Sequence, residues 1–347
     1  IRVLIINQTK MPAETHKTPM HRADLQQNGS YLPSFQSTWE EDAHRRTEHT
    51  FPDKHTISNL ISWASKMLHD HNIDSPRLDA EVILSYLLDC KRISFYVHPD
   101  KSVENPIAVS YQKAIQRRSQ RVPLHYITHH AEFMSLDFYV DERVLIPRPE
   151  TELVVEAVIK KSQILSKEEE IVMVDIGVGS GNIAIALVKK IDKARVFAVD
   201  ISPDALSVAA MNAQRHEVPN TITFLCGDTF TPLEGYGIEG KADFIISNPP
   251  YVSSNEFSTL QKEVRDHEPY IALVSGEDGF PMFKRIIAHA NTWLRPGGFI
   301  IFEVGEKQAQ QVAQFIENTG RFKKPELVKD YQNIDRIVVA QMEESCG

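Results

Sequence analysis

The hydrophobic pattern of the chain is helical at first. From about Thr56, apolar residues recur three and four positions apart, as on one face of an amphipathic helix. These residues are Ile57, Leu60, Ile61, Ala64 and Leu68. A second helix is predicted from Ser75-Pro76 to Leu87, because serine can cap a helix and proline fits its first turn. A third is expected over residues 107–121, before Pro123, and the three should form a small bundle.

After the bundle the pattern changes to short apolar runs. Alternation over residues 132–140 suggests a β-hairpin, and a structured linker follows at 144–152. Strands are then expected at 171–176, 196–200, 222–226, 242–247 and 299–304 and near Leu327 and Ile337, and helices at 183–190, 203–215, 280–293 and 307–317. Strands that alternate with helices form βαβ units, so the sequence predicts an α/β fold: a parallel sheet with helices on both faces.

These patterns divide the chain into four segments. Residues 1–54 mix polar residues without a period and should form a poorly ordered leader. Residues 55–123 should form the helical domain, 124–148 the hairpin and linker, and 149–347 the α/β domain. Basic residues outnumber acidic ones near the start of the leader, as in an organelle transit peptide, which favours a mitochondrial over a cytoplasmic location. An ordinary tail is the alternative.

Composition excludes several classes of protein. The 347 residues are 42% hydrophobic and 24% charged, which suits a folded chain. No apolar run reaches the roughly 18 residues of a membrane span, so no membrane association is expected. The distant cysteines Cys90, Cys226 and Cys346 give neither a disulfide framework nor a zinc site. The pair His129 and His130 lacks further ligands at a suitable spacing, so we expect no metal.

The charge balance bears on the partners of the protein. The chain carries a net charge of −9, from 47 acidic and 38 basic residues. Proteins bind nucleic acids largely by neutralising phosphates, so this balance disfavours direct nucleic-acid binding.

A glycine-rich turn carries the first chemical signal. The expected strand at 171–176 runs into Gly-Val-Gly-Ser-Gly and then a helix. Glycines let the backbone approach a ligand, and the helix offers free N–H groups. A dinucleotide-binding loop needs its third glycine where Asn182 stands, whereas this spacing is the form seen in class I (Rossmann-like) S-adenosylmethionine-dependent methyltransferases. The loop residues assigned to cofactor binding are Gly177, Val178, Gly179, Ser180 and Gly181.

Acidic residues follow the next two expected strands. Asp200 ends the second strand, where a carboxylate can accept both ribose hydroxyls of a nucleoside. Ser202 suits the cap of the following helix better than Asp200 does. Asp228 follows the third strand and can accept from an adenine amino group, with an ordinary turn aspartate as the alternative. We assign Asp228 and the adjacent Thr229 to the cofactor.

The fourth expected strand ends in Asn248-Pro249-Pro250-Tyr251. Two successive prolines make a rigid turn and remove two N–H donors. The Asn248 Oδ1 and the Pro249 carbonyl can then accept the two hydrogens of a planar NH₂ group, and the Tyr251 ring can cover that group. The motif therefore predicts a methyl-acceptor site for a planar nitrogen, with Asn248, Pro249, Pro250 and Tyr251 as catalytic residues and Asn248 also touching the cofactor.

Together with Val-Leu-Ile-Pro-Arg-Pro-Glu-Thr-Glu at 144–152, this motif makes the chain resemble the N5-glutamine methyltransferases of the HemK/PrmC type, which modify peptide chain release factors. Further matches are Val-Arg-Asp-His-Glu-Pro at 264–269, Ala272, Leu273, Gly276, Gly279, Phe-Glu-Val-Gly at 302–305, Asp330, Tyr331, Asp335 and Arg336. The resemblance covers about 57–341 and assigns no role to Glu150 or Glu152. Two departures are Thr229, where relatives often have an aromatic residue, and the stretch 125–133, which lacks a usual glycine.

The resemblance implies methyl transfer from S-adenosylmethionine to a side-chain amide. The acceptor is the glutamine of the Gly-Gly-Gln motif in a release factor, and the helical bundle and hairpin would clamp this protein substrate. An amide nitrogen is a weak nucleophile, so positioning should supply most of the catalysis, without metal. The alternatives are a glutamine of a ribosomal protein, the exocyclic amine of adenine in a nucleic acid, and a binding module that has kept the fold.

Overall fold

The apolar spacing after Thr56 is realised as a helical bundle in the computed structural model, which describes residues 50–165 and 169–344. Helix α1 (Ile57–Asp70) is capped by Thr56, whose hydroxyl accepts a hydrogen bond from the Asn59 N–H. Helices α2 (Pro76–Leu87) and α4 (Asn105–Ser119) pack against it. Ser75 occupies the N-cap position of α2 and Pro76 its first turn, as predicted, but the Ser75 side chain makes no capping hydrogen bond.

The bundle is larger than the three predicted helices. Two short helices, α3 (Ile93–Val97) and α5 (Leu124–Thr128), were missed because five residues are too few to show a helical period. Phe51, which the sequence placed in the leader, packs edge-on against Trp63 of α1 with ring centroids 4.9 Å apart. The packed structure therefore begins before residue 55.

The expected hairpin forms from β1 (Ala131–Phe133) and β2 (Leu136–Phe138). Its turn residues Met134 and Ser135 both have positive φ, as in a tight hairpin. Glu152 accepts a hydrogen bond from the Met134 N–H and ties the hairpin to the next helix. That helix, α6 (Glu152–Ser162), was not predicted; a 3₁₀ turn over Pro149–Thr151 leads into it.

The alternating half of the chain forms a sheet with the strand order β5-β4-β3-β6-β7-β9-β8. Its strands are β3 (Ile171–Ile176), β4 (Ala194–Asp200), β5 (Ile222–Cys226), β6 (Ala242–Ser247), β7 (Leu294–Glu303), β8 (Glu326–Lys329) and β9 (Asp335–Gln341). The strands from β5 to β7 are parallel, whereas β9 is antiparallel to β7 and β8. The strands of the alternating stretch are parallel, as predicted, whereas β8 and β9 are joined by a turn too short for a crossover and pair antiparallel. The fold is the class I arrangement predicted.

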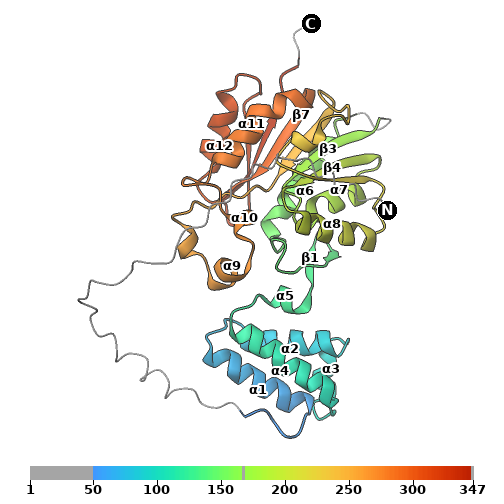
Figure 1. The fold of residues 1–347 in the computed structure, drawn as a ribbon, viewed down its shortest axis with the longest axis vertical. Coiled ribbons are helices and arrows are strands. Elements are labelled where there is room, and N and C mark those ends of the chain that lie inside the picture. Colours follow the sequence, from blue (N-terminus) through green and yellow to red (C-terminus); the bar gives the residue numbers. More distant parts are fainter. Residues whose placement is uncertain (1–49, 166–168, 345–347) are drawn as a thin grey trace, which may run out of the picture.

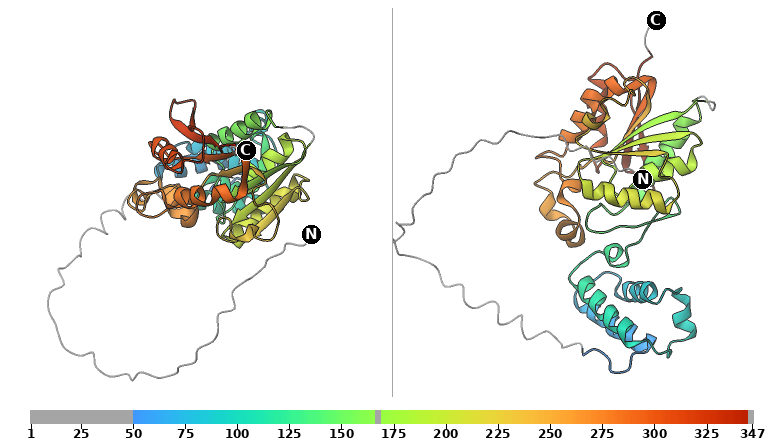
Figure 2. Two further views of the ribbon diagram at one scale, coloured as in Figure 1. Left: turned by 90° about the horizontal axis from the view of Figure 1, so that it is seen from above. Right: turned by 45° about the vertical axis from the view of Figure 1, so that its right-hand side comes forward.

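Helices cover both faces of the sheet (Figures 1 and 2). One face packs on α6, α7 (Asn182–Lys190) and α8 (Pro203–Arg215), and the other on α11 (Pro281–Trp293) and α12 (Ala309–Glu317). In β3, Met173 faces the first layer and Val174 the second, and both are fully buried. Burial on both faces explains why the strands read as continuous apolar runs. Between β6 and α11 the chain forms the short helices α9 (Lys262–His267) and α10 (Tyr270–Leu273).

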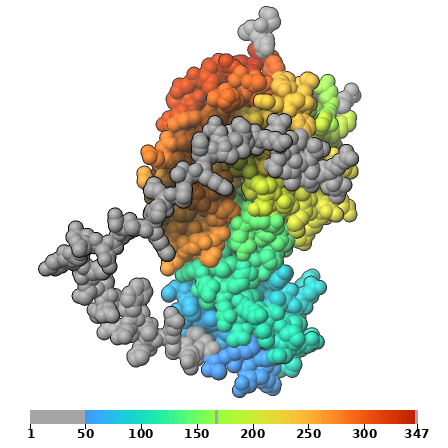
Figure 3. All heavy atoms as spheres, in the orientation of Figure 1, coloured from blue at the N-terminus to red at the C-terminus, as the bar shows by residue number. Residues whose placement is uncertain are grey.

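The core of the bundle continues into the connecting segment and α8. Ile146, Ala205 and Val208 are buried in the same hydrophobic cluster as the bundle residues. Figure 1 shows α5 and β1 between the helical bundle and the α/β part, and Figure 3 shows the surface as continuous from one part to the other. One hydrophobic core therefore includes residues from both sides of the predicted domain boundaries at 123/124 and 148/149. These boundaries stay predictions.

Several predictions concern residues outside the described ranges. Residues 1–49 of the expected leader and Cys346 lie there, so the mitochondrial location also stays a prediction. Within the described ranges, no helix is both long and apolar enough to cross a bilayer. In the same part of the chain, no group of three or more His, Cys, Asp or Glu side chains is arranged to hold a metal ion.

Candidate active site

Chemically active residues continue the ends of neighbouring strands in one row. Ile176 of β3 pairs with Val199 of β4 and with Ser247 of β6, and Ser247 pairs with Phe302 of β7. The residues that come next in these strands are Gly177, Asp200, Asn248 and Glu303. The strand order changes direction between β3 and β6, where open α/β sheets bind ligands. The sheet therefore brings the glycine loop and the Asn-Pro-Pro-Tyr turn to one edge.

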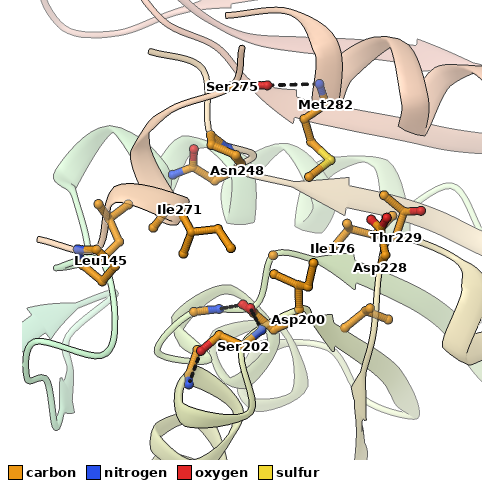
Figure 4. A pocket seen from close by; sticks show the side chains of 18 of the residues that line it. Leu145, Ile176, Asp200, Ser202, Asp228, Thr229, Asn248, Ile271, Ser275 and Met282 are labelled. Atoms are coloured by element: carbon orange, nitrogen blue, oxygen red, sulfur yellow. Dashed lines mark hydrogen bonds between the residues drawn. The ribbon is translucent and has the colours of Figure 1, made fainter. Parts of the chain in front are cut away.

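A cavity of about 330 Å³ lies at this edge. Apolar side chains, among them Ile176, Ile271 and Met282, form much of its wall. In Figure 4, Asn248 lies above the cavity and Asp200 below it, with Asp228 and Thr229 at one side. The predicted site residues that line it are Gly177, Gly179, Asp200, Asp228, Thr229, Asn248 and Pro250.

A smaller cavity of about 30 Å³ shares Gly177, Gly179 and Asn248 with the first. Val178 and Ser180 line this smaller space, together with residues of the 144–152 segment. Gly181, Pro249 and Tyr251 line neither cavity.

The three glycines of the loop have different roles. All have positive φ: 80° at Gly177, 53° at Gly179 and 83° at Gly181. A Cβ on Gly179 would meet no atom nearer than 4.0 Å, and one on Gly177 none nearer than 3.8 Å, so both leave open space. A Cβ on Gly181 would lie 3.2 Å from the Ala209 Cβ of α8. Gly181 therefore permits close packing against α8, and its assignment to the cofactor stays a prediction.

Asp200 supports the glycine loop as well as lining the cavity. Its Oδ2 accepts a hydrogen bond from the Gly179 N–H and its Oδ1 one from the Ser202 N–H, each at 2.9 Å. Each oxygen keeps a further lone pair. Burial raises the pKa of this carboxyl. As expected, Ser202 and not Asp200 caps α8, because its hydroxyl accepts from the Ala205 N–H.

An ion pair lies at the other end of the cavity. Arg285 of α11 donates to the Asp228 Oδ2, and both side chains contribute to the lining. Any ligand amino group must therefore be accepted by the remaining lone pairs of Asp228. Thr229, which follows, has a φ of 47°.

The Asn248 side chain is held from behind. Its Nδ2 donates to the Thr151 Oγ1 at 3.2 Å, and the Thr151 hydroxyl donates to the Glu303 Oε2 at 2.6 Å. Thr151 and Glu303 are each 2% exposed. The network engages the Asn248 nitrogen and not its Oδ1.

Tyr251 supports the turn instead of lining the site. Its carbonyl accepts a hydrogen bond of 2.9 Å from the Gln308 Nε2, and Gly279 lies so close to that carbonyl that a Cβ there would collide with it. A Cβ on Gly305 would lie 3.0 Å from the Tyr251 Cδ2. The ring packs against the core on the α11 and α12 side. The cover of the acceptor amide by the Tyr251 ring stays a prediction.

The segment after the turn joins three parts of the molecule. Pro269 and Ile271 line the cavity. Glu268 accepts from the Arg148 Nη2 at 2.5 Å and from the Ile146 N–H at 3.3 Å, which ties α9 and α10 to the connecting segment. Glu263 of α9 accepts from Arg118 and Arg121 of the bundle, at 3.3 and 2.9 Å. The cavity wall is therefore anchored to the helical bundle.

Two buried carboxyl groups lie near the site. Burial raises the pKa of Glu303 to about 7. Burial, followed by the nearby Asp200 carboxylate, raises the pKa of Asp175 to about 7. Asp175 is fully buried, and neither of its carboxylate oxygens has a side-chain hydrogen-bond partner among the described residues.

The sequence analysis quoted Thr151 and Glu303 only as parts of motifs and missed Arg285 altogether. A signal for Glu303 was present, because a carboxylate that ends an apolar strand lies at the same sheet edge as Asn248. Thr151 and Arg285 carried no comparable signal, since their positions depend on the packing of helices.

Comparison with known proteins agrees with this geometry. The family described as PrmC N-terminal domain matches residues 59–128, and the family described as Methyltransferase small domain matches residues 151–266. A release factor glutamine methyltransferase of Rhodopirellula baltica is 37% identical over 287 residues, covering 82% of this chain and 96% of that protein. One of Moorella thermoacetica is 37% identical over 289 residues, covering 83% and 99%. The two family models and identity of this extent over nearly the full length of these relatives show that the chain belongs to the release factor glutamine methyltransferase family.

Proposed function

We propose that the protein transfers a methyl group from S-adenosylmethionine to the side-chain amide nitrogen of the glutamine in the Gly-Gly-Gln motif of a peptide chain release factor. The observation that carries the proposal is the placement of the Asn248 Oδ1. Its amide nitrogen donates to Thr151 and Asn248 lines the cavity beside the glycine loop, so the Oδ1 is the end of the amide that stays available to accept a hydrogen bond. The names of the relatives support the protein substrate.

The residues of the larger cavity fit the cofactor. Gly177 and Gly179 leave space that a Cβ would fill. Asp200 keeps lone pairs for ribose hydroxyls, and Asp228 keeps lone pairs for an adenine amino group. The volume of about 330 Å³ lies within the range of small-molecule sites. When bound, S-adenosylmethionine supplies an electrophilic methyl group carried by a sulfonium.

The Asn-Pro-Pro-Tyr turn would hold the acceptor. The Asn248 Oδ1 would accept one hydrogen of the glutamine NH₂, and the carbonyl of Pro249, a residue next to the cavity lining, would accept the other, which fixes the direction of the nitrogen. Oxygen acceptors at these hydrogens also favour the positive charge that develops on the nitrogen. Pro250 lines the cavity, and Tyr251 keeps the turn in place through its carbonyl and ring.

The helical bundle would bind the body of the release factor. A glutamine on a loop offers too little surface for specific binding by itself. The bundle is paired through Arg118 and Arg121 with Glu263 of α9, in the segment that goes on to line the cavity, so a substrate that touches both the bundle and the cavity would be held at two points.

Mass spectrometry tests the proposal. A release factor is incubated with the protein and S-adenosylmethionine, beside a copy whose Gly-Gly-Gln glutamine is replaced by alanine. We expect one methyl-sized mass gain in the intact factor and none in the other. No gain in either, with cofactor binding shown by calorimetry, would contradict the release-factor substrate and direct the search to glutamines of ribosomal proteins and then to adenine in oligonucleotides.

A further inference from the structure

We propose that Thr151 and Glu303 are positioning residues that determine which end of the Asn248 amide faces the acceptor. The inference deepens the proposed function and rests on it for its catalytic consequence. Its structural content is independent of the substrate: a chain of two hydrogen bonds from Asn248 through Thr151 to Glu303.

The direction of these two hydrogen bonds follows from the number of hydrogens available. An ionised carboxylate only accepts hydrogen bonds, so the single hydroxyl hydrogen of Thr151 must be donated to Glu303. The Thr151 oxygen then has only lone pairs left for Asn248. It can accept from the amide nitrogen but cannot donate to the amide oxygen. Asn248 must therefore present its Nδ2 to Thr151 and its Oδ1 to the cavity.

The opposite orientation would defeat the site. With Nδ2 toward the cavity, the Asn248 amide would face the NH₂ of the acceptor, donor against donor. An asparagine side chain has no intrinsic preference between its two orientations, because the amide oxygen and nitrogen have nearly the same size. The hydrogen-bond network supplies the missing preference.

Thr151 is held firmly enough for this task. It lies between two helical turns, its N–H donates to the Arg148 carbonyl at 3.1 Å, and its side chain is buried. Neighbouring residues of the same segment have other attachments: Arg148 binds Glu268, and Glu152 binds the hairpin turn at Met134. One short segment thus aligns the catalytic turn, the cavity wall and the hairpin.

The test compares Thr151→Val with Thr151→Ser. Valine keeps the shape of threonine but removes the hydroxyl, whereas serine keeps the hydroxyl. We expect Thr151→Val to lower kcat on the release factor about 10- to 100-fold, with the Kd for S-adenosylmethionine unchanged by calorimetry. Thr151→Ser should restore kcat to within a few-fold of wild type. Equal kcat in wild type and Thr151→Val, or equal losses in both variants, would overturn the proposal.

A spectroscopic readout separates this inference from the proposed function. In protein labelled with ¹⁵N-asparagine, the side-chain NH₂ signals of Asn248 are identified by their loss in Asn248→Ala. We expect one Asn248 proton to exchange slowly with solvent in wild type and Thr151→Ser, and rapidly in Thr151→Val. Unchanged exchange in Thr151→Val contradicts the network whatever the substrate. If the hydrogen exchange is as expected but the wild-type protein does not methylate a release factor, only the proposed function is contradicted.

Discussion

The Asp200 Oδ2 accepts a hydrogen bond of 2.9 Å from the Gly179 N–H, so the end of one strand holds the glycine loop that follows its neighbour. The other oxygen holds the Ser202 N–H at the start of α8. A ligand that binds Asp200 therefore meets a loop and a helix whose positions this side chain already sets.

We expect Asp200→Ala to weaken S-adenosylmethionine binding about 10- to 100-fold, because it removes a ribose acceptor and frees the glycine loop. Isothermal titration calorimetry measures this effect. Asp204→Ala is the matched control, since it removes the same charge from the exposed first turn of α8. An unchanged Kd in Asp200→Ala would refute the ribose role.

Asn248→Ala should reduce methylation of the release factor at least 100-fold, because the acceptor loses one of its two hydrogen-bond partners at the reacting nitrogen. The thermal unfolding midpoint of the cofactor-free protein should change little. Methyl transfer is followed by mass spectrometry, with the Kd for S-adenosylmethionine measured on the same preparation. Near-normal turnover in this variant would eliminate the assigned acceptor site.

The methylation rate should fall as the pH is lowered through about 7, because the pKa of Glu303 is raised to about 7 by burial. Above this pH the ionised Glu303 can only accept the hydrogen bond from the Thr151 hydroxyl. Below it the protonated carboxyl can itself donate to Thr151, so the orientation of the Asn248 amide is no longer fixed. Glu150, Arg148 and Arg336 are the charged groups that act on Glu303, and Arg148 and Arg336 oppose the upward shift.

Glu303→Gln supplies the comparison for this pH effect. A glutamine oxygen can accept from Thr151 at every pH, so the rate of the variant should vary less between pH 6 and 8. These rates are measured at saturating cofactor. If the methylation rate of Glu303→Gln changes with pH as steeply as that of wild type, a group other than Glu303 titrates.

Asp175→Asn should make the protein more stable at pH 8. The pKa of Asp175 is raised from its ordinary value of 3.8 to about 7 in the folded chain. Between these values the folded state binds a proton that the unfolded state releases, so wild-type stability falls as pH rises across this window. The variant should gain up to about 4 kcal/mol above pH 7 and much less near pH 4. Urea unfolding at both pH values measures the difference, and an equal gain at both would contradict an ionised Asp175.

Much of the sheet could be predicted because its strands are buried on both faces. β3 and β6 occur at the residues expected, since their apolar runs are bounded by polar turns. The glycine loop and the Asn-Pro-Pro-Tyr turn were also predicted as separate motifs. Their adjacency depends on strand order and register, which the amphipathic pattern does not contain.

The contacts that complete the site could not be predicted from the sequence pattern. Thr151 and Glu303 are 152 positions apart, and Arg285 pairs with Asp228 across 57. Such pairs form only once β7 and α11 have packed against the rest of the sheet. The position of Tyr251 depends on similar long-range packing, because the absence of side chains at Gly279 and Gly305 leaves space for this residue on the core side.

The ion pairs of Glu263 with Arg118 and Arg121 connect the helical bundle to the α/β part of the protein. Glu263 belongs to the segment that also supplies Pro269 and Ile271 to the cavity wall, so a rotation of the bundle pulls directly on that wall. Exposed charges are screened by salt, whereas pairs this buried are screened less. One wall of the cavity is thus coupled to the position of helix α4, which supplies no residue to the cavity lining.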